Sequence, residues 1–220
     1  MTKASAQQSI SDLDRLDQLL LEASKNPEGI VTDQNTGLEY TLPGLISMGA
    51  YLNIKDLDGK TPLMHSCERL ILNNVRSLIS ESAEVNLQDS KGMSALMMLS
   101  SLPRANSSFS STIQHEIYEE LIENGAQINL EDVKGKTAII FSAHSGHKDL
   151  TKLLINEGSD AELKDKSGMS AIDYARNEAN QEINSEQSPD SNTTNETSSE
   201  NEVISLYPQG ESKFDKYDLR

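Results

Sequence analysis

The stretch DLDGKTPLMHSC, from Asp56 to Cys67, places an acid, a glycine, a Thr-Pro pair and an apolar run within twelve residues. Similar stretches follow at DSKGMSALMMLS (89–100), DVKGKTAIIFSA (132–143) and DKSGMSAIDYAR (165–176). Their glycines are 33, 43 and 33 residues apart. Self-similarity at a nearly fixed period is the signature of a repeat architecture. The chain is therefore expected to be an array of one recurring unit.

Each unit begins with residues that favour a tight turn followed by a helix. An Asp can bond its own backbone in a turn, and the Gly three positions later can adopt a positive φ without a steric penalty. A Thr or Ser then stands where a helix N-cap is needed, and Pro62 suits the first helical position after one of them. The four sets are Asp56, Gly59 and Thr61; Asp89, Gly92 and Ser94; Asp132, Gly135 and Thr137; and Asp165, Gly168 and Ser170.

A second helix is expected in the first three units, because apolar residues recur there at i, i+3 and i+4 and share one buried face. In the first unit these residues are Val75, Leu78 and Ile79. The later sets are Ile117, Leu121 and Ile122, and then Leu150, Leu153, Leu154 and Ile155. Each helix ends near Ser82, Gly125 or Gly158, and Gly at such a position closes a helix in the left-handed conformation.

The pattern D-x-x-G-x-T-P-L, followed by a two-helix body and a G-A-x-x-N ending, resembles the ankyrin repeat. The resemblance implies an all-α solenoid of stacked helix-turn-helix units with short β-turn fingers. The family's usual His after Pro-Leu is Met64, Met97 or Ile140 here, so its Thr–His bonding is expected to be absent. The expected units are a degenerate N-terminal capping unit 12–55, the units 56–88, 89–131 and 132–164, and a C-terminal capping unit 165–183.

The segments around and within the array 12–183 have a different composition. Residues 1–11 are polar and expected to be flexible. Pro103 and a serine run predict an extruded loop at 102–112, which is either without a role or a contact through Arg104 and Phe109. The tail 184–220 is acidic and begins almost without apolar residues, so it is expected to be disordered. Its apolar motif 203–219 is either a peptide that folds on a partner or a segment that folds back onto the last unit.

The formal net charge of −16 argues against nucleic-acid binding, because most of the surface would repel phosphates. The simplest explanation of this charge is solubility. Cys67 is the only cysteine, so no disulfide can form within the chain, which suits the cytoplasm or the nucleus. No apolar run is long enough for a membrane span, and a monomer is expected. Delivery into a host cell without a signal peptide is the alternative location.

No catalytic motif is found in the sequence, so we expect no enzyme activity, no cofactor and no metal. His144 and His147 have a ligand-like spacing, but no Cys or carboxylate cluster accompanies them. Cys67 falls where the repeat places a small buried residue, which favours a packed thiol over a nucleophile. Methionines at 64, 93, 97 and 98 are interpreted as core, with Met93 as a possible exception.

The resemblance to ankyrin proteins implies that the residues contacting a partner flank the turn glycine and lie late in the first helix. Six lysines lie in or beside the turns of this chain, so we expect a locally basic row there and a partner with an acidic or mixed segment. The alternative is that exposed turns are simply rich in lysine. The predicted partner-binding residues are Leu57, Asp58, Lys60, Arg69, Ser90, Lys91, Met93, Val133, Lys134, Lys136, His144, Lys166 and Met169.

The predicted function is that of a non-enzymatic adaptor or regulator that holds one protein on the concave face of the array. One alternative is a regulatory or inhibitory subunit, or a chaperone, of an enzyme. Another is a secreted bacterial effector that acts on host proteins.

Overall fold

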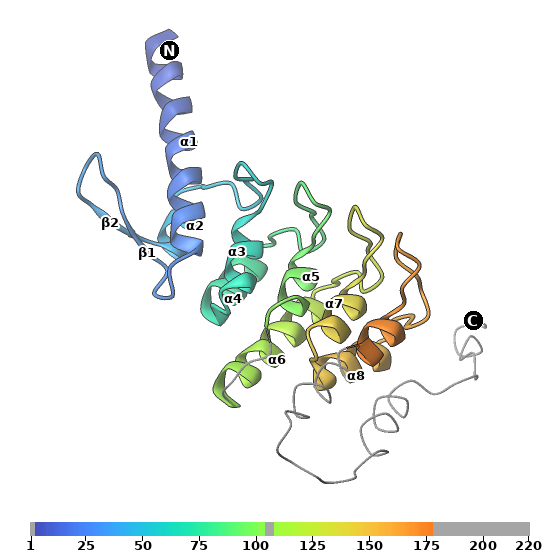
Figure 1. The fold of residues 1–220 in the computed structure, drawn as a ribbon. Coiled ribbons are helices and arrows are strands. Elements are labelled where there is room, and N and C mark those ends of the chain that lie inside the picture. Colours follow the sequence, from blue (N-terminus) through green and yellow to red (C-terminus); the bar gives the residue numbers. More distant parts are fainter. Residues whose placement is uncertain (1–2, 104–107, 178–220) are drawn as a thin grey trace, which may run out of the picture.

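Four turn-and-helix units follow an N-terminal cap in a computed structural model that describes residues 3–103 and 108–177 (Figure 1). The cap consists of α1 (Lys3–Ser24), β1 (Ile30–Thr32), β2 (Glu39–Thr41) and α2 (Leu42–Ser47). The units consist of α3 (Pro62–Glu68) with α4 (Leu72–Ser80), α5 (Ala95–Ser100) with α6 (Ser108–Glu123), α7 (Ala138–His144) with α8 (Lys148–Asn156), and a helical segment at 171–177.

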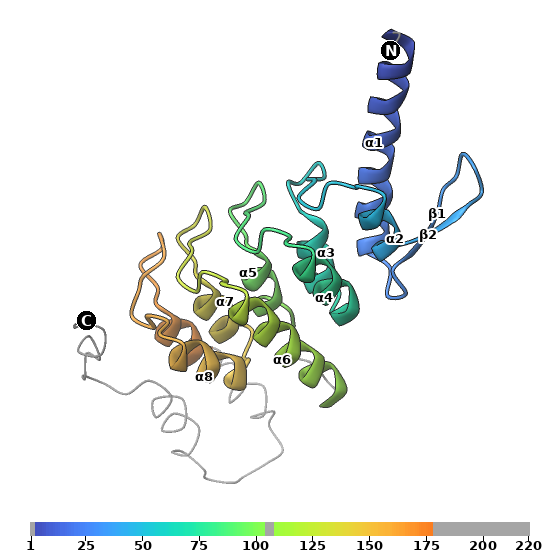
Figure 2. The ribbon, with the colours of Figure 1, turned by 180° about the vertical axis from the view of Figure 1, so that it is seen from behind.

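The helix pairs lie side by side in chain order, and the loop before each inner helix projects from the same side of the molecule (Figures 1 and 2). Helix α3 packs against α5 and α5 against α7, while α4 packs against α6. We call α3, α5 and α7 the inner helices, and we call the loops 51–60, 84–93, 127–136 and 160–169 the first to fourth finger loops. The mostly helical repeat fold that the sequence predicts is confirmed.

The inner helices are the buried layer of the array. Every residue of Pro62–Cys67 and of Ala95–Ser100 is buried, because each inner helix lies between two neighbouring units. The outer helices α4 and α8 bury only one face, through Val75 and Leu78 and through Leu150 and Leu154. Small residues and methionines fill the inner layer, and Met64 and Met97 are fully buried as predicted.

The predicted flexible segment 1–11 is largely wrong, because α1 begins at Lys3 and continues to Ser24. The helix has a physical basis in composition. Residues 3–24 contain neither Gly nor Pro, and many of them are good helix formers, so the amphipathic pattern around Leu16 and Leu20 extends towards the N-terminus. Polarity alone does not separate an exposed helix from an irregular segment.

A two-stranded antiparallel sheet in the cap is the one departure from a helical fold in the described residues, and the sequence analysis did not predict it. Ile30 pairs with Thr41 and Thr32 with Glu39. At the loop, the Asp33 side chain accepts hydrogen bonds from the backbone N–H of Asn35 and from the Thr36 hydroxyl. Asp33 also forms an ion pair with Arg15 of α1, which joins the hairpin to the helix. The Arg15 side chain is the main cause that lowers the pKa of Asp33 to about 2.

The predicted loop 102–112 is wrong in its second half, because α6 begins at Ser108. Pro103 does lie outside a helix, and 104–107 lie outside the described residues. Serine is a weak helix former but is favourable near a helix N-terminus, so the serine run opens α6 rather than preventing it. The side chains of Arg104 and Phe109, the tail 184–220 and the motif 203–219 all lie outside the described part of the chain.

Candidate functional site

The four finger loops share one set of hydrogen bonds around their leading Asp. In the first finger loop the Asp56 Oδ1 atom accepts from the backbone N–H groups of Asp58 and Lys60, at 3.0 and 2.9 Å. The Gly59 N–H donates to the Asp56 carbonyl at 2.9 Å. Asp89, Asp132 and Asp165 accept the corresponding bonds in their own loops at 2.8 to 3.1 Å. The turn chemistry predicted from the sequence is therefore confirmed in all four units.

The finger loops are also bonded to one another. The N–H of Ser90 donates to the Asp58 carbonyl at 2.9 Å, and the N–H of Val133 donates to the Lys91 carbonyl at 3.0 Å. The N–H of Lys166 continues the series to the Lys134 carbonyl at 2.9 Å. One backbone bond therefore joins each finger loop to the next, which makes the row of loop tips a continuous and ordered surface.

The residues predicted to cap the inner helices stand at the N-cap position, but they do not act alike. The hydroxyls of Thr61 and Ser94 each accept from a backbone N–H three residues later, at 3.3 Å. Ser170 accepts from the N–H of Asp173, whose carboxylate accepts in return from the Ser170 N–H. Thr137 occupies the N-cap position without a side-chain cap bond.

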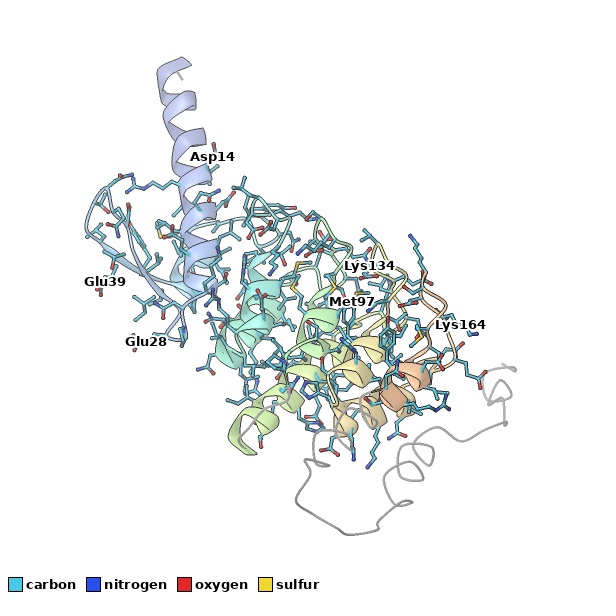
Figure 3. The ribbon with its side chains drawn as sticks, viewed as in Figure 1. Asp14, Glu28, Glu39, Met97, Lys134 and Lys164 are labelled. Carbon is cyan, nitrogen blue, oxygen red and sulfur yellow. The ribbon has the colours of Figure 1, made fainter. Side chains whose placement is uncertain are left out.

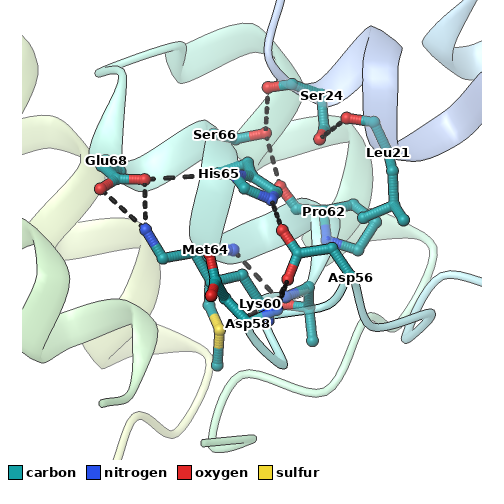
Figure 4. Close-up of polar contacts among 11 residues, drawn as sticks. Leu21, Ser24, Asp56, Asp58, Lys60, Pro62, Met64, His65, Ser66 and Glu68 are labelled. Atoms are coloured by element: carbon teal, nitrogen blue, oxygen red, sulfur yellow. Dashed lines mark hydrogen bonds and ion pairs between the residues drawn. The ribbon is translucent and has the colours of Figure 1, made fainter. Parts of the chain in front are cut away.

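A side chain nine residues after the Asp braces the turn in the two end units. The His65 Nε2–H donates to Asp56 Oδ2 at 2.7 Å, and the Tyr174 hydroxyl donates to Asp165 Oδ2 at 2.8 Å (Figure 4 shows the His65 contact). The predicted loss of a His tie at position 64 is thus compensated one residue later. Burial is the main cause that lowers the pKa of His65, against the effect of Asp56. Burial works against ionisation of Asp56 as well, but the Lys60 N–H and the His65 ring lower its pKa.

The lysines of the finger loops have different surroundings. Lys60 Nζ is paired with Glu68 at 2.8 Å, and Lys166 Nζ donates to the Val133 carbonyl at 2.7 Å. Lys91 and Lys134 are exposed and form no ion pair with any other described residue. Figure 3 shows Lys134 among the finger loops. The expected basic row is therefore partly neutralised at its N-terminal end and uncompensated at Lys91 and Lys134.

Two apolar side chains stand exposed at the tips of the finger loops. Leu57 is fully exposed, and Val133 is 54% exposed. Met93 and Met169 are half-buried at the base of their loops. An exposed Leu at the tip of an ordered turn contributes nothing to the core, so these two tips are available for contact with another molecule.

The structure brings most of the predicted partner-binding residues to the finger loops and the C-terminal ends of the inner helices. Asp58, Arg69, Ser90 and His144 are exposed, and Lys136 is half-buried. The sequence reasoning missed Phe141 and Tyr174. The Lys136 ammonium lies over both rings, and the His144 ring packs edge-on against Tyr174 with centroids 5.2 Å apart. Their shared position, nine residues after Asp132 and Asp165, is a regularity in the sequence that could have identified them.

None of the potentially reactive groups forms a constellation in the described residues. His147 Nε2 bonds the Leu102 carbonyl at 2.6 Å, whereas His144 faces Tyr174, so the two rings do not converge. Cys67 is buried, and burial raises the pKa of its thiol. No set of three or more His, Cys, Asp or Glu is placed to hold a metal within 3–103 and 108–177. No described helix is long and apolar enough to cross a membrane.

A helical array with an ordered row of exposed loop tips is the architecture of a repeat protein. Comparison with known families agrees: residues 109–184 match the family of ankyrin repeats (3 copies), so this part of the chain consists of ankyrin repeats. The match begins in α6 of the second unit and continues through the third and fourth units, and the turns of the first and second units show the same bonds in the structure. A search of curated proteins found no significant match. Ankyrin repeats are generally modules for protein–protein interaction.

Proposed function

We propose that this protein is a non-enzymatic adaptor or regulator that binds a protein partner on the concave face of an ankyrin-type solenoid. The face consists of the finger loops and the exposed ends of the inner helices. One observation carries the proposal. The backbone bonds between successive finger loops fix Leu57, Lys91, Val133 and Lys134 on one ordered row, where the first and third are exposed and the lysines have no described ion partner.

The chemistry of the row indicates the kind of partner. Two apolar tips supply anchor positions, and the lysines favour a partner segment with acidic or mixed charge. Charges at the edge of an interface increase the association rate and fix orientation more than they increase affinity. The proposed residence is the cytoplasm or the nucleus, which the single buried thiol of Cys67 supports.

The test is capture of a partner from a lysate by the full chain, read by mass spectrometry. The variant carries Lys91→Glu and Lys134→Glu, and it leaves Lys166 unchanged because that side chain bonds the neighbouring finger loop. A control with Lys152→Glu, Asn73→Asp and Asn156→Asp changes the net charge equally, at exposed positions of the outer helices.

We expect the finger-loop variant to lose most of the stoichiometric capture and the control to retain it. Equal capture by both variants would overturn the proposal. A captured partner that binds only the outer-helix surface, and is lost in the control alone, would do the same.

A further inference from the structure

The four units can be compared position by position, because their turns share the same bonds. The residue four positions after the leading Asp is Lys60, Met93, Lys136 and Met169 in the successive units. The residue twelve positions after it is Glu68, Ser101, His144 and Asn177. Lysine therefore occurs in the first and third units only, and a carboxylate faces it in the first unit only.

The first unit shows how such a lysine is satisfied. The Lys60 ammonium contacts both carboxylate oxygens of Glu68, at 2.9 and 2.8 Å (Figure 4). Glu68 is the last residue of α3, and its side chain remains 41% exposed. The pair thus forms at the open end of the inner helix, on the same surface that carries the predicted contacts.

The third unit has the same lysine without the carboxylate. The Lys136 ammonium lies 4.4 Å from the centroid of the Tyr174 ring and 5.8 Å from that of Phe141. His144 stands where the first unit has Glu68, with its ring edge-on to Tyr174 at 73°. Asp165 lies close enough to Lys136 for the two charges to interact, but its carboxylate is buried and already accepts from Tyr174, Ser167 and Met169. Among the residues that the structure describes, no carboxylate lies at hydrogen-bond distance from the Lys136 ammonium.

We propose that a glutamate or aspartate side chain of the protein partner binds Lys136. It would stand to Lys136 in the third unit as Glu68 stands to Lys60 in the first unit. The site consists of Lys136, Phe141, His144 and Tyr174, and it rests on the proposed function of the finger-loop face. The two rings position the ammonium by its face-on attraction to their π-systems, which leaves its N–H groups able to donate to a carboxylate. A charge-assisted bond to a half-buried ammonium is stronger than one to a fully solvated lysine.

The partner is an acidic protein segment rather than a nucleic acid. A single carboxylate matches a single ammonium, whereas a nucleic acid presents a continuous row of phosphates whose binding requires several neutralising cations. The net charge of −16 opposes such a row far more than it opposes one carboxylate. The neighbouring aromatic rings and the exposed Val133 on the same finger loop add apolar surface beside the charge. A segment in which acidic and apolar residues alternate fits this combination.

The test is an NMR titration of the full-length, ¹⁵N-labelled chain with a synthetic peptide in which glutamate alternates with leucine. The same peptide with glutamine in place of glutamate is the ligand control. Lys136→Met places in the third unit the residue that the second and fourth units carry there. His144→Glu recreates the arrangement of the first unit, so the new carboxylate should pair with Lys136 and block access of the peptide. Lys152→Met is the matched control, because this exposed lysine lies on the outer helix α8 and not on the finger-loop face.

We expect the glutamate peptide to shift the amide signals of Lys136 and Tyr174, and the glutamine peptide to leave them unchanged. Both Lys136→Met and His144→Glu should weaken binding at least tenfold, while Lys152→Met should change it less than twofold. Glu68→His should create a second, weaker site at Lys60. Amide signals outside the site report that each variant is folded.

Binding that is unchanged in Lys136→Met and in His144→Glu would overturn the proposal, as would no localised binding of the glutamate peptide. The proposal would also be overturned if acidic residues of the chain itself, beyond 177, occupy the site. In that case the signals of Lys136 and Tyr174 would change when the chain ends at 177, without any peptide. If the partner captured from a lysate is lost in the Lys91 and Lys134 variant but retained by His144→Glu, the proposed function stands and this site does not.

Discussion

At the scale of single residues, the turn glycine serves two purposes that the structure separates. Gly92 has a φ of 77°, and a Cβ there would lie 2.8 Å from the backbone nitrogen of Val133 in the next finger loop. Gly168 has the same position in its turn and a φ of 80°, but no described atom lies within 4 Å of the place that a Cβ would take, because the described residues include no further finger loop beyond it. The left-handed conformation is therefore required at both sites, and close approach of a neighbour at only one.

We predict that Gly92→Ala destabilises the protein more than Gly168→Ala. The backbone conformation alone costs an Ala about 1 to 2 kcal/mol. At Gly92 the Cβ also forces the third finger loop away and weakens its bond to Lys91, so the cost should be roughly twice as large. Urea unfolding of both variants measures the difference. Equal losses would show that the bond between the finger loops is not rigid.

The buried His65 leads to a prediction about pH. Its pKa is lowered from the usual 6.5, mainly by burial and further by the charges of Lys25 and Lys60, while Asp56 acts in the opposite direction. Just below pH 6.5 the unfolded chain therefore binds a proton that the folded chain does not, so stability falls as the pH drops through this range. Above about pH 7 the His65 ring is neutral in both the folded and the unfolded chain, so it no longer makes stability depend on pH.

His65→Gln should therefore flatten the dependence of stability on pH between about 5 and 7, while lowering stability at pH 7.5 through the lost bond to Asp56. Asp56 contributes a separate loss only below its usual pKa of 3.8, because its own pKa is lowered. Urea midpoints at several pH values check both parts. A slope between pH 5 and 7 as steep as that of the parent chain would contradict the assignment to His65.

At the scale of elements, the sequence predicts what is repeated and misses what is not. The four turns, the caps at Thr61 and Ser94 and the buried faces of the outer helices follow from local rules that recur in register. The hairpin does have a local signal, because an Asp-Gln-Asn-Thr-Gly turn lies between two β-rich triplets at Ile30 and Glu39. It occurs once, however, so no repetition drew attention to it.

The sequence predicted where the candidate site lies, but not which side chains its lysines contact. Sequence spacing places the lysines in the turns, but the pairing of Lys60 with Glu68 joins residues eight positions apart across a turn and a helix. The contact between Lys136 and Tyr174 joins two units 38 positions apart in the sequence. Such contacts depend on how neighbouring units stack, and no local pattern encodes that distance.

One element depends on its neighbour for its C-terminal end, which leads to a third prediction. The buried Asn74 of α4 donates from Nδ2 to the carbonyls of Ala23 and Asn26 at 3.2 and 3.3 Å, and Ser66 of α3 donates to the Ser24 carbonyl at 3.2 Å. The carbonyls of Ala23 and Asn26 also accept from the backbone N–H groups of Asn26 and Gly29, so Asn74 supplies a second donor to each. Side chains of the first unit therefore fix the cap onto the array.

Asn74→Ala should cost about 1 to 3 kcal/mol, because it removes two side-chain hydrogen bonds that contribute about 0.5 to 1.5 kcal/mol each. The exposed neighbour Asn73→Ala is the control and should change stability by less than about 0.5 kcal/mol. Hydrogen exchange should become faster at residues 19–24 and remain unchanged in α7. Uniformly faster exchange would indicate that the cap and the array unfold as one unit.

At the scale of the whole molecule, each unit is stabilised mainly by the next one along the chain. Helix α5 lies between α3 and α7, and the finger loops are bonded only to their neighbours among the described residues. The stability of such an array is close to a sum of unit terms and neighbour terms. The two end units brace their leading Asp with His65 and Tyr174, where the central units have Met98 and Phe141. The extra bonds therefore occur where a unit has one repeat neighbour fewer.

The last prediction concerns this dependence on neighbours. A chain that ends at residue 164 lacks the fourth unit, and with it the packing of Tyr174 against His144 at the C-terminal end of α7. A chain that ends at residue 177 retains every described contact and is the control. We expect the shorter chain to unfold at lower urea concentration than the control, with faster hydrogen exchange in α7 and α8 and little change in α3, because neighbour terms act locally. Equal loss of protection in α3 would mean that the units fold as one cooperative body, and the row of finger loops would then respond to a partner as a whole.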